Sequence, residues 1–119
     1  MAYVDGFVLP VPKKNLAAYR KLSVKMGKIT RELGALEYIE CVADDVKMGK
    51  VTSFPRSVKI KKGETVVLSW IVYKSRKHRD QINAKLMKDP RVLKMMTLGP
   101  MPFDPKRMFV GGFKVFVDV

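Results

Sequence analysis

Residues that form disulfides, bind metals or cross membranes are scarce in this sequence. Cysteine, histidine and tryptophan each occur once among 119 residues, so an intrachain disulfide is excluded, and Cys41 and His78 alone make no metal-ligand set. No apolar run approaches the roughly 18 residues that a transmembrane helix needs. The first residues lack the basic segment that opens a signal peptide. We therefore expect a cytoplasmic protein with no membrane segment, no metal and no cofactor.

Acidic residues are also few, which leaves a large positive charge. Lys and Arg number 24 and Asp and Glu number 11, for a formal net charge of +13. Such a charge attracts polyanions, including RNA and DNA, although a solvated basic surface is the commoner explanation. The chain has no RNP-type aromatic motif and no Gly-x-x-Gly loop that would clamp RNA. Nucleic-acid binding is therefore an alternative that we do not favour.

Length and hydrophobic periodicity predict one domain over residues 1–119 with an α+β fold. Strand patterns alternate apolar residues, and helix patterns repeat them every three or four positions. Within residues 44–64 the pattern is undecided, and the segment from Phe54 fits either a short helix or a strand. The expected elements are strand 2–11, helix 15–33, strand 35–43, strand 65–73, a helix capped by Ser75 that ends near Lys88, a short helix from Pro90 to Gly99, and strand 108–117.

The order β-α-β-β-α-β has one common solution. It is the ferredoxin-like sandwich, in which four antiparallel strands carry both helices on one face. The uncovered face should then be polar. Instead, residues 65–73 and 108–117 are apolar on both faces. Because a bare apolar sheet is an interaction surface, we expect a homodimer that packs sheet against sheet around a two-fold axis.

Short motifs along almost the whole chain resemble those of one family. They are Tyr3-Val4-Asp5-Gly6-Phe7-Val8, Gly34-Ala35-Leu36, Glu40-Cys41, Gly49-Lys50-Val51-Thr52, Phe54, Ser69-Trp70-Ile71, Tyr73, Asp89-Pro90-Arg91, Met101-Pro102-Phe103-Asp104, Lys106-Arg107-Met108 and Gly111-Gly112-Phe113. Together they resemble the YbaA-like family of small bacterial proteins. The resemblance implies a fold of the dimeric α/β-barrel type, and no particular activity, although some members carry a label tying them to the RNA of the signal recognition particle.

The resemblance also suggests where a site would lie. Dimeric α/β-barrel proteins include cofactor-free monooxygenases and haem-degrading proteins, whose sites lie between sheet and helices and are lined by Trp, His, Asn or Tyr. The matching candidates here are Trp70, Tyr73, His78 and Asn83. The structural alternative for Trp70 is a core or interface aromatic, and for His78 it is an exposed helix surface.

The loop before the last strand supplies a second pair of candidates. Asp104 and Arg107 are close enough in sequence to hold an anion or carboxylate, with Arg107 as the forked donor. They could equally form a salt bridge that anchors the last strand. The leading interpretation is a homodimeric small-molecule-binding or accessory protein. The alternatives are a cofactor-independent monooxygenase or isomerase, and a nucleic-acid-binding module.

Overall fold

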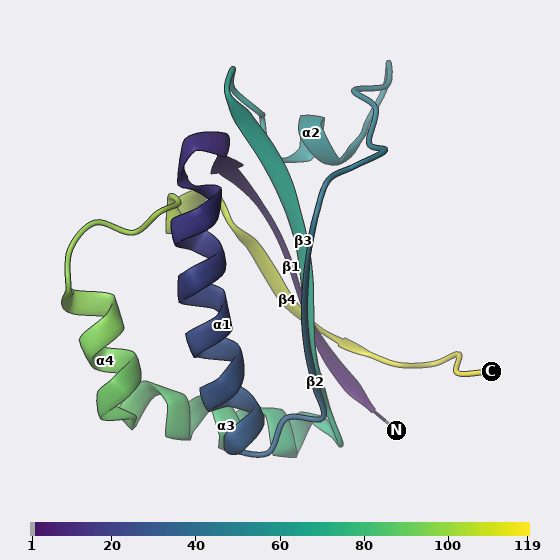
Figure 1. Ribbon diagram of the computed structural model, residues 1–119. Helices are drawn as coiled ribbons and strands as arrows, with labels where there is room; N and C mark the ends of the chain where they lie inside the picture. The colour runs from purple at the N-terminus through teal and green to yellow at the C-terminus, as the bar shows by residue number, and fades with distance from the viewer. Residues whose placement is uncertain (1) are drawn as a thin grey trace.

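A four-stranded antiparallel sheet organises the computed structural model, which describes residues 2–119. The strands are β1 (Tyr3–Pro12), β2 (Glu37–Val42), β3 (Glu64–Tyr73) and β4 (Phe109–Lys114), in the spatial order β2-β3-β1-β4. Helices α1, α3 and α4 lie on one side of the sheet, and the short α2 lies on the other (Figure 1). This arrangement confirms the predicted ferredoxin-like fold.

Side-chain caps set the limits of the helices much as the sequence indicates. The helices are α1 (Leu16–Glu32), α2 (Phe54–Ser57), α3 (Arg76–Lys88) and α4 (Pro90–Thr97). The hydroxyl of Ser75 accepts from the backbone N–H of His78, and Asp89 accepts from that of Arg91, which satisfies donors at each helix start. Gly34 follows α1 at φ +122°, a conformation that glycine adopts readily.

Three local details go beyond what the sequence pattern indicates. Asn15 occupies the N-cap position of α1, but its side chain donates to the backbone oxygen of Pro102 at 3.2 Å and does not cap the helix. The last strand ends at Lys114 and not at residue 117, because the β1–β4 pairing ends where Tyr3 meets Lys114. The loop 100–107 contains the 3-10 turn η2 (Pro105–Arg107), and a second turn, η1 (Lys13–Asn15), precedes α1.

The undecided segment 44–64 forms a long connection that contains the short helix α2. Ser53 caps α2 by accepting from the backbone N–H of Arg56. The Arg56 guanidinium donates to the backbone oxygens of Met48 and Gly49, which holds the loop against the helix. The segment lies beside one end of β3, where Val58 and Val66 are both buried. It therefore covers one corner of the sheet face that faces away from α1.

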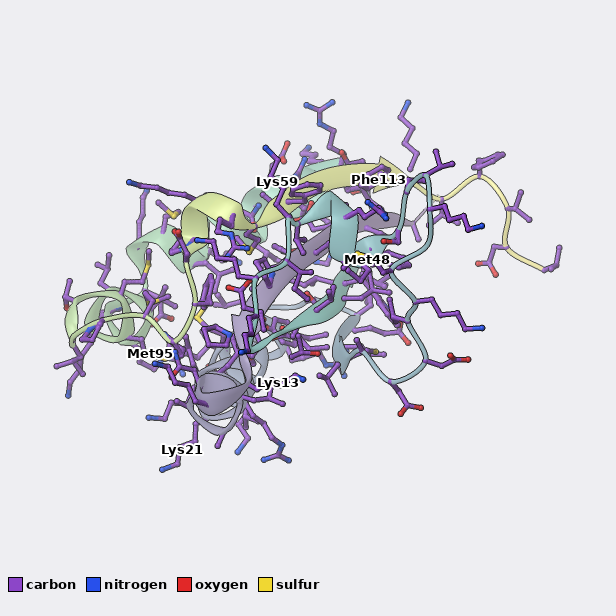
Figure 2. The ribbon with its side chains drawn as sticks, turned by 90° about the horizontal axis from the view of Figure 1, so that it is seen from above. Lys13, Lys21, Met48, Lys59, Met95 and Phe113 are labelled. Carbon is purple, nitrogen blue, oxygen red and sulfur yellow. The ribbon has the colours of Figure 1, made fainter. Side chains whose placement is uncertain are left out.

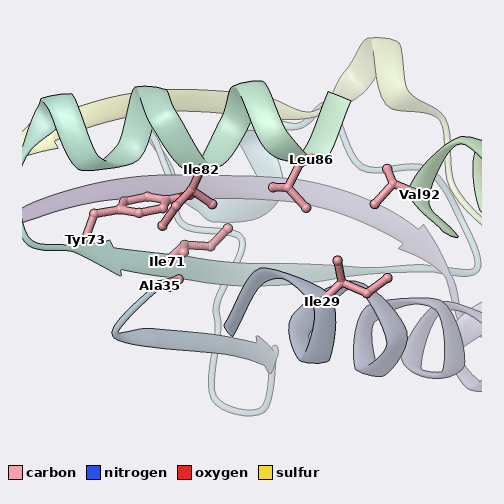
Figure 3. Close-up of a cluster of buried hydrophobic side chains, with 7 residues drawn as sticks. All are labelled: Ile29, Ala35, Ile71, Tyr73, Ile82, Leu86 and Val92. Carbon is pink, nitrogen blue, oxygen red and sulfur yellow. The ribbon is translucent and has the colours of Figure 1, made fainter. Parts of the chain in front are cut away.

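The main core lies between the sheet and helices α1, α3 and α4. Strand register gives Val67, Ile71 and Tyr73 of β3 to this side, and all three are less than 9% exposed. Figure 3 shows Ile82 and Leu86 of α3 pointing toward Ile71 and Tyr73. A neighbouring cluster is centred on Leu9, Val11, Tyr19 and Val67. Burial of this apolar surface is the chief stabilising term in folding.

The opposite side of the sheet, here called the open face, is apolar and exposed. Register places Ile39, Trp70, Leu68, Phe109 and Phe113 on it. Leu68 is 39% exposed, Phe109 51% and Phe113 64%. Figure 2, seen from above, shows Met95 and Phe113 at well-separated positions of the molecule. The expected two-sided apolar sheet is therefore present, and the segment that contains α2 covers one corner of its open face.

The neighbouring glycines of β4 serve opposite faces. On the open face, a Cβ at Gly111 would lie 3.6 Å from the ring of Phe113, an ordinary contact. On the helix side, a Cβ at Gly112 would lie 2.7 and 2.8 Å from ring carbons of Tyr3. Gly112 is thus required for Tyr3 to pack across β4, a close approach of the kind that glycine permits in strands.

Candidate functional site

An apolar cleft of about 430 Å³ lies between the sheet and the helices. Its volume is within the range of small-molecule sites. Flexible methionines and aromatic rings supply most of its surface, which suits an adaptable apolar site. The apolar lining includes Phe7, Leu22, Met26, Leu86, Met95, Met96, Met101, Phe103, Met108 and Val110.

A buried ion pair forms one polar part of the cleft. Asp5 is 4% exposed on the floor formed by β1, and its Oδ1 accepts from Nη1 of Arg79 on α3 at 3.0 Å. Arg79 also donates to the Tyr3 hydroxyl at 3.3 Å and lies 5.0 Å from that ring's centroid. Burial raises the pKa of the Asp5 carboxyl, and the charge of Arg79 opposes part of that rise. Two elements thus hold a carboxylate at a fixed place in an apolar site.

The Tyr73 hydroxyl is the second polar feature. Tyr73 is fully buried at the end of β3, and its hydroxyl makes no hydrogen bond of good geometry within residues 2–119, although it lies close enough to the Asp5 carboxylate to lower the pKa of that carboxyl. Burial raises the pKa of this phenol, and the nearby Asp5 carboxylate raises it further. The hydroxyl is therefore a neutral donor. Since an unpaired buried hydroxyl lowers stability, a ligand that accepts from it would gain binding energy.

A carboxylate and two phenols form the third polar feature. Glu40 of β2 accepts from the Tyr19 hydroxyl on α1 through Oε1 and from the Tyr38 hydroxyl at 3.0 Å through Oε2. Burial and then Glu40 raise the pKa of both tyrosines. α1 can approach β2 closely because Gly27 is buried there, and a Cβ on it would lie 2.7 Å from the Tyr38 ring. This bridge of Tyr19, Glu40 and Tyr38 borders the cleft.

Outside the bridge lies an open groove between α1 and β2, here called the outer groove. Its volume is about 1060 Å³, and its lining includes Leu16, Val24, Lys28, Arg31 and Val42. Tyr19, Ser23, Tyr38 and Glu40 border both the outer groove and the cleft. The bridge therefore separates the cleft from the outer groove.

Comparison with known proteins places the chain in a family. The sequence pattern of the family described as "Protein of unknown function (DUF1428)" matches residues 2–105. The chain is also 49% identical over 119 residues to "Uncharacterized protein YbaA" of Escherichia coli K12, a match covering 99% of each chain. It therefore belongs to the YbaA-like DUF1428 family. The YbaA protein of Shigella flexneri matches to the same extent, so the predicted family is confirmed.

A solved structure supports the fold of this YbaA-like chain. The crystal structure of a dimeric ferredoxin-like protein from an uncultured marine organism matches with a TM-score of 0.56, covering 99% of this chain and 98% of that one. At 14% sequence identity, the likeness shows the fold alone. The family pattern ends before β4, whereas the YbaA match extends over that strand.

The structure brings together two of the four aromatic and polar residues predicted from the resemblance. Tyr73 and Asn83 both border the cleft, and Trp70 reaches its lining from the strand whose other face carries the indole. Trp70 belongs to the open face, because β3 alternates and Trp70 pairs with Gly6 and Ile39. The ring of His78 accepts from the backbone N–H of Lys74 through Nδ1 at 3.0 Å and packs edge-on against Tyr73. His78 is thus engaged in ordering the start of α3, and we expect it to have a structural part there.

The loop candidates Asp104 and Arg107 do not border the cleft. Asp104 caps η2 by accepting from the backbone N–H of Lys106. Arg107 forms a forked pair with Glu64, at 2.6 and 2.9 Å, and donates to the backbone oxygens of Val58 and Lys59. Arg107 of this loop therefore forms its ion pair with Glu64 of β3 and not with Asp104. Arg107 anchors the approach to β4.

Removing this anchor is expected to lower stability. We expect Arg107→Ala to lower the free energy of unfolding by about 2 kcal/mol, because charge-assisted hydrogen bonds contribute roughly that much. Arg107 lowers the pKa of Glu64 below its ordinary value of 4.5. The pair's contribution is therefore present above pH 4.5 and is lost as the pH falls below it. Urea unfolding at pH 7 and pH 3 measures this, and a difference between wild type and variant that is equal at both pH values contradicts it.

The polar residues of the cleft that the prediction missed left a signal in the sequence. Asp5 stands among Tyr3, Phe7 and Leu9 on the apolar side of the first strand, and Glu40 occupies the corresponding place in β2. Charged residues on a core-facing strand side are rare unless they are paired. That pattern alone could have identified both carboxylates. Arg79 gave no such signal, since it lies within the basic run 74–79.

The described part of the chain has neither a metal-binding cluster nor a membrane-spanning helix. Across residues 2–119, no three His, Cys, Asp or Glu side chains gather where they could hold a metal ion. No helix in this part of the chain combines the length and apolar character that crossing a membrane requires. The basic side chains of α1 are exposed, and Figure 2 shows Lys21 pointing outward. Contact between these side chains and phosphate stays a prediction.

Proposed function

We propose that this YbaA-like protein is a homodimer that binds a small, largely apolar molecule in the cleft. The observation that carries the proposal is a mostly apolar cavity that contains an unpaired, fully buried hydroxyl on Tyr73. A packed structural core would leave neither the space nor the unpaired donor. A ligand that fills the apolar space and accepts a hydrogen bond from the Tyr73 hydroxyl would account for both the cavity and the unpaired donor.

The charges of the cleft narrow the class of ligand. Asp5 and Glu40 are carboxyl groups, and the one guanidinium on the lining, Arg79, is already paired with Asp5. An anion would meet two carboxylates without a free cation, at a cost in desolvation. We therefore expect a neutral ligand with a carbonyl or ether oxygen for Tyr73. This is so even though the protein carries a net charge of +13.

Filling the cleft floor tests binding. Ser69 lies on the helix side of β3 and is 6% exposed. We expect Ser69→Val to raise the Kd for the neutral fluorescent amine N-phenyl-1-naphthylamine about tenfold, because side-chain volume added against a bound molecule typically costs 1–3 kcal/mol. Fluorescence titration measures the Kd.

Thr65→Ile is the matched control, since it adds apolar volume to β3 outside the cleft lining. We expect it to leave the Kd unchanged. If wild type does not bind the amine, or if both variants weaken binding equally, the cleft is not the binding site. Thermal melting of each variant separates a local effect from loss of the fold.

The second part of the proposal is that two copies pack through their open faces. Support comes from the exposed side chains of Leu68, Phe109 and Phe113 on one continuous sheet face. The crystal structure similar in fold is of a protein described as dimeric. A second copy offers a surface of the same apolar character, as a two-fold interface requires.

A further inference from the structure

We infer that Asp5 and Tyr73 form a proton-transfer pair that acts on an enolisable carbonyl compound bound in the cleft. The inference rests on the proposed function, because the compound must first enter the cleft. It assigns Asp5 as the base that removes a proton from carbon. It assigns Tyr73 as the hydrogen-bond donor to the carbonyl oxygen. No metal, cofactor or oxidant takes part in the step.

The position of the two groups supports this assignment. Tyr3 pairs with Tyr73 and Asp5 pairs with Ile71, so Asp5 and Tyr73 are diagonal neighbours on the helix side of the sheet. Both border the cleft, and each shifts the pKa of the other. The Tyr73 hydroxyl makes no hydrogen bond of good geometry and lies beside the Asp5 carboxylate, so a ligand oxygen competes with that carboxylate alone for its proton.

Arg79 is a positioning residue for Asp5. It contacts Oδ1, while the side chains of Tyr73 and Asn83 lie close enough to the carboxylate to lower the pKa of Asp5 as well. The same guanidinium lies within 2.9 Å of Asp80 and donates to Tyr3, which fixes it in place. One oxygen of Asp5 is thus anchored while the other remains available to a proton on a bound molecule. Burial makes that carboxyl a stronger base than an exposed one.

The chemistry balances without a co-reactant. The Asp5 carboxylate takes the proton from the carbon next to the carbonyl, and the C–H electron pair becomes the C=C bond of an enolate. The carbonyl π electrons move to oxygen, where the developing charge is stabilised by the O–H of Tyr73. When the proton on Asp5 is first replaced by a deuteron from solvent, return to the same carbon gives exchange; when the enolate is conjugated with a second C=C bond, return to the far carbon of that system gives a double-bond isomer. A buried carboxyl and a neutral phenol suit these two parts.

Deuterium exchange into a defined ketone tests the inference. The probe is 2-tetralone, a neutral bicyclic ketone with acidic protons beside its carbonyl, incubated with the full-length protein in D₂O at neutral pH. Proton NMR follows loss of the signal of those protons, and saturation-transfer NMR reports binding in the same sample. We expect wild type to accelerate exchange above buffer and Asp5→Asn to lower that acceleration by about 100-fold, the usual size of an acid–base contribution. We expect Tyr73→Phe to lower it about tenfold or more.

The variants separate catalysis from structure. Asn at position 5 can still accept from Arg79, and Tyr73→Phe removes an unpaired buried hydroxyl, so it is expected to melt at or above the wild-type temperature. Asp45→Asn, in the exposed loop after β2, is the matched carboxyl control and should exchange at the wild-type rate. Should Asp5→Asn fail to fold, Tyr73→Phe decides alone.

The two proposals fail in different ways. Binding of 2-tetralone by wild type with exchange no faster than in buffer, or with exchange unaffected by Asp5→Asn and Tyr73→Phe, overturns proton transfer and leaves ligand binding intact. If 2-tetralone gives no saturation-transfer signal with wild type, the proposal that the cleft binds an enolisable carbonyl compound is wrong. The naphthylamine titration with Ser69→Val then decides whether the cleft binds ligands at all.

Discussion

If two copies pack through their open faces as proposed, Leu68→Glu is expected to convert the dimer into a monomer at micromolar concentration. Leu68 lies on the open face between Cys41 and Val8 and is 39% exposed in the single chain. In a sheet-to-sheet dimer the substituted carboxylate would be buried without a partner, which typically costs 3–5 kcal/mol. Both copies carry it, so we expect the dimer Kd to rise by about 10,000-fold or more. Sedimentation velocity measures the change.

Val51→Glu is the matched control for the charge change. Val51 lies in the loop before α2 and is 93% exposed, so the same substitution there should leave the dimer intact. Leu68→Glu should still fold, since its side chain can reach water in the separated chain. Wild type that sediments as a 13.6 kDa species, or a Leu68→Glu protein as dimeric as Val51→Glu, would show that the open face is not the interface.

Gly112→Ala is expected to lower the stability of the fold much more than the same substitution at Gly111. The new Cβ would lie 2.7 and 2.8 Å from ring carbons of Tyr3, closer than carbon atoms approach. Tyr3 is 7% exposed and pairs with Arg79, which holds Asp5. Displacement of Tyr3 would remove its packing against β4 and weaken the Asp5–Arg79 ion pair. We therefore expect the free energy of unfolding to fall by about 2–3 kcal/mol. The midpoint of thermal unfolding should fall by roughly 6–12 °C.

Gly111→Ala provides the control from the adjacent residue. Its Cβ would meet Phe113 at 3.6 Å, an ordinary contact, so the melting temperature should change little. In a Tyr3→Ala background, Gly112→Ala should lose most of its effect, because the two substitutions act through one contact. Equal destabilisation by Gly111→Ala and Gly112→Ala would instead indicate a general requirement for backbone freedom in β4.

The arrangement of helices and strands could be predicted because local signals agree with the global fold. The caps Ser75 and Asp89 and the turn residue Gly34 mark helix limits that the structure confirms. The long apolar strand 65–73 matches β3 to within one residue. The secondary structure of residues 44–64 could not be predicted, because their conformation depends on contacts made by Arg56 and Arg107 with distant backbone oxygens.

The site was harder to predict than the fold for a geometric reason. Its residues come from both the strands and the helices, so spacing within one element does not reveal it. Tyr73 and Asn83 were identified through the resemblance, which also suggested Trp70, yet alternation along β3 sends Trp70 to the other face. Asp104 and Arg107 were chosen as neighbours in sequence, whereas the true partner of Arg107, Glu64, is 43 residues away.

The bridge of Tyr19, Glu40 and Tyr38 has a kinetic consequence. It joins α1 to β2 through hydrogen bonds from two phenols to one carboxylate, and it stands where the outer groove meets the cleft. A molecule that passes between these spaces must break at least one of those bonds and then let it reform behind it. The transient opening slows arrival and departure by the same factor. Passage by this route is therefore governed by how often the bridge opens, whereas the side of the cleft bordered by the exposed Met96 and Val110 reaches solvent without it.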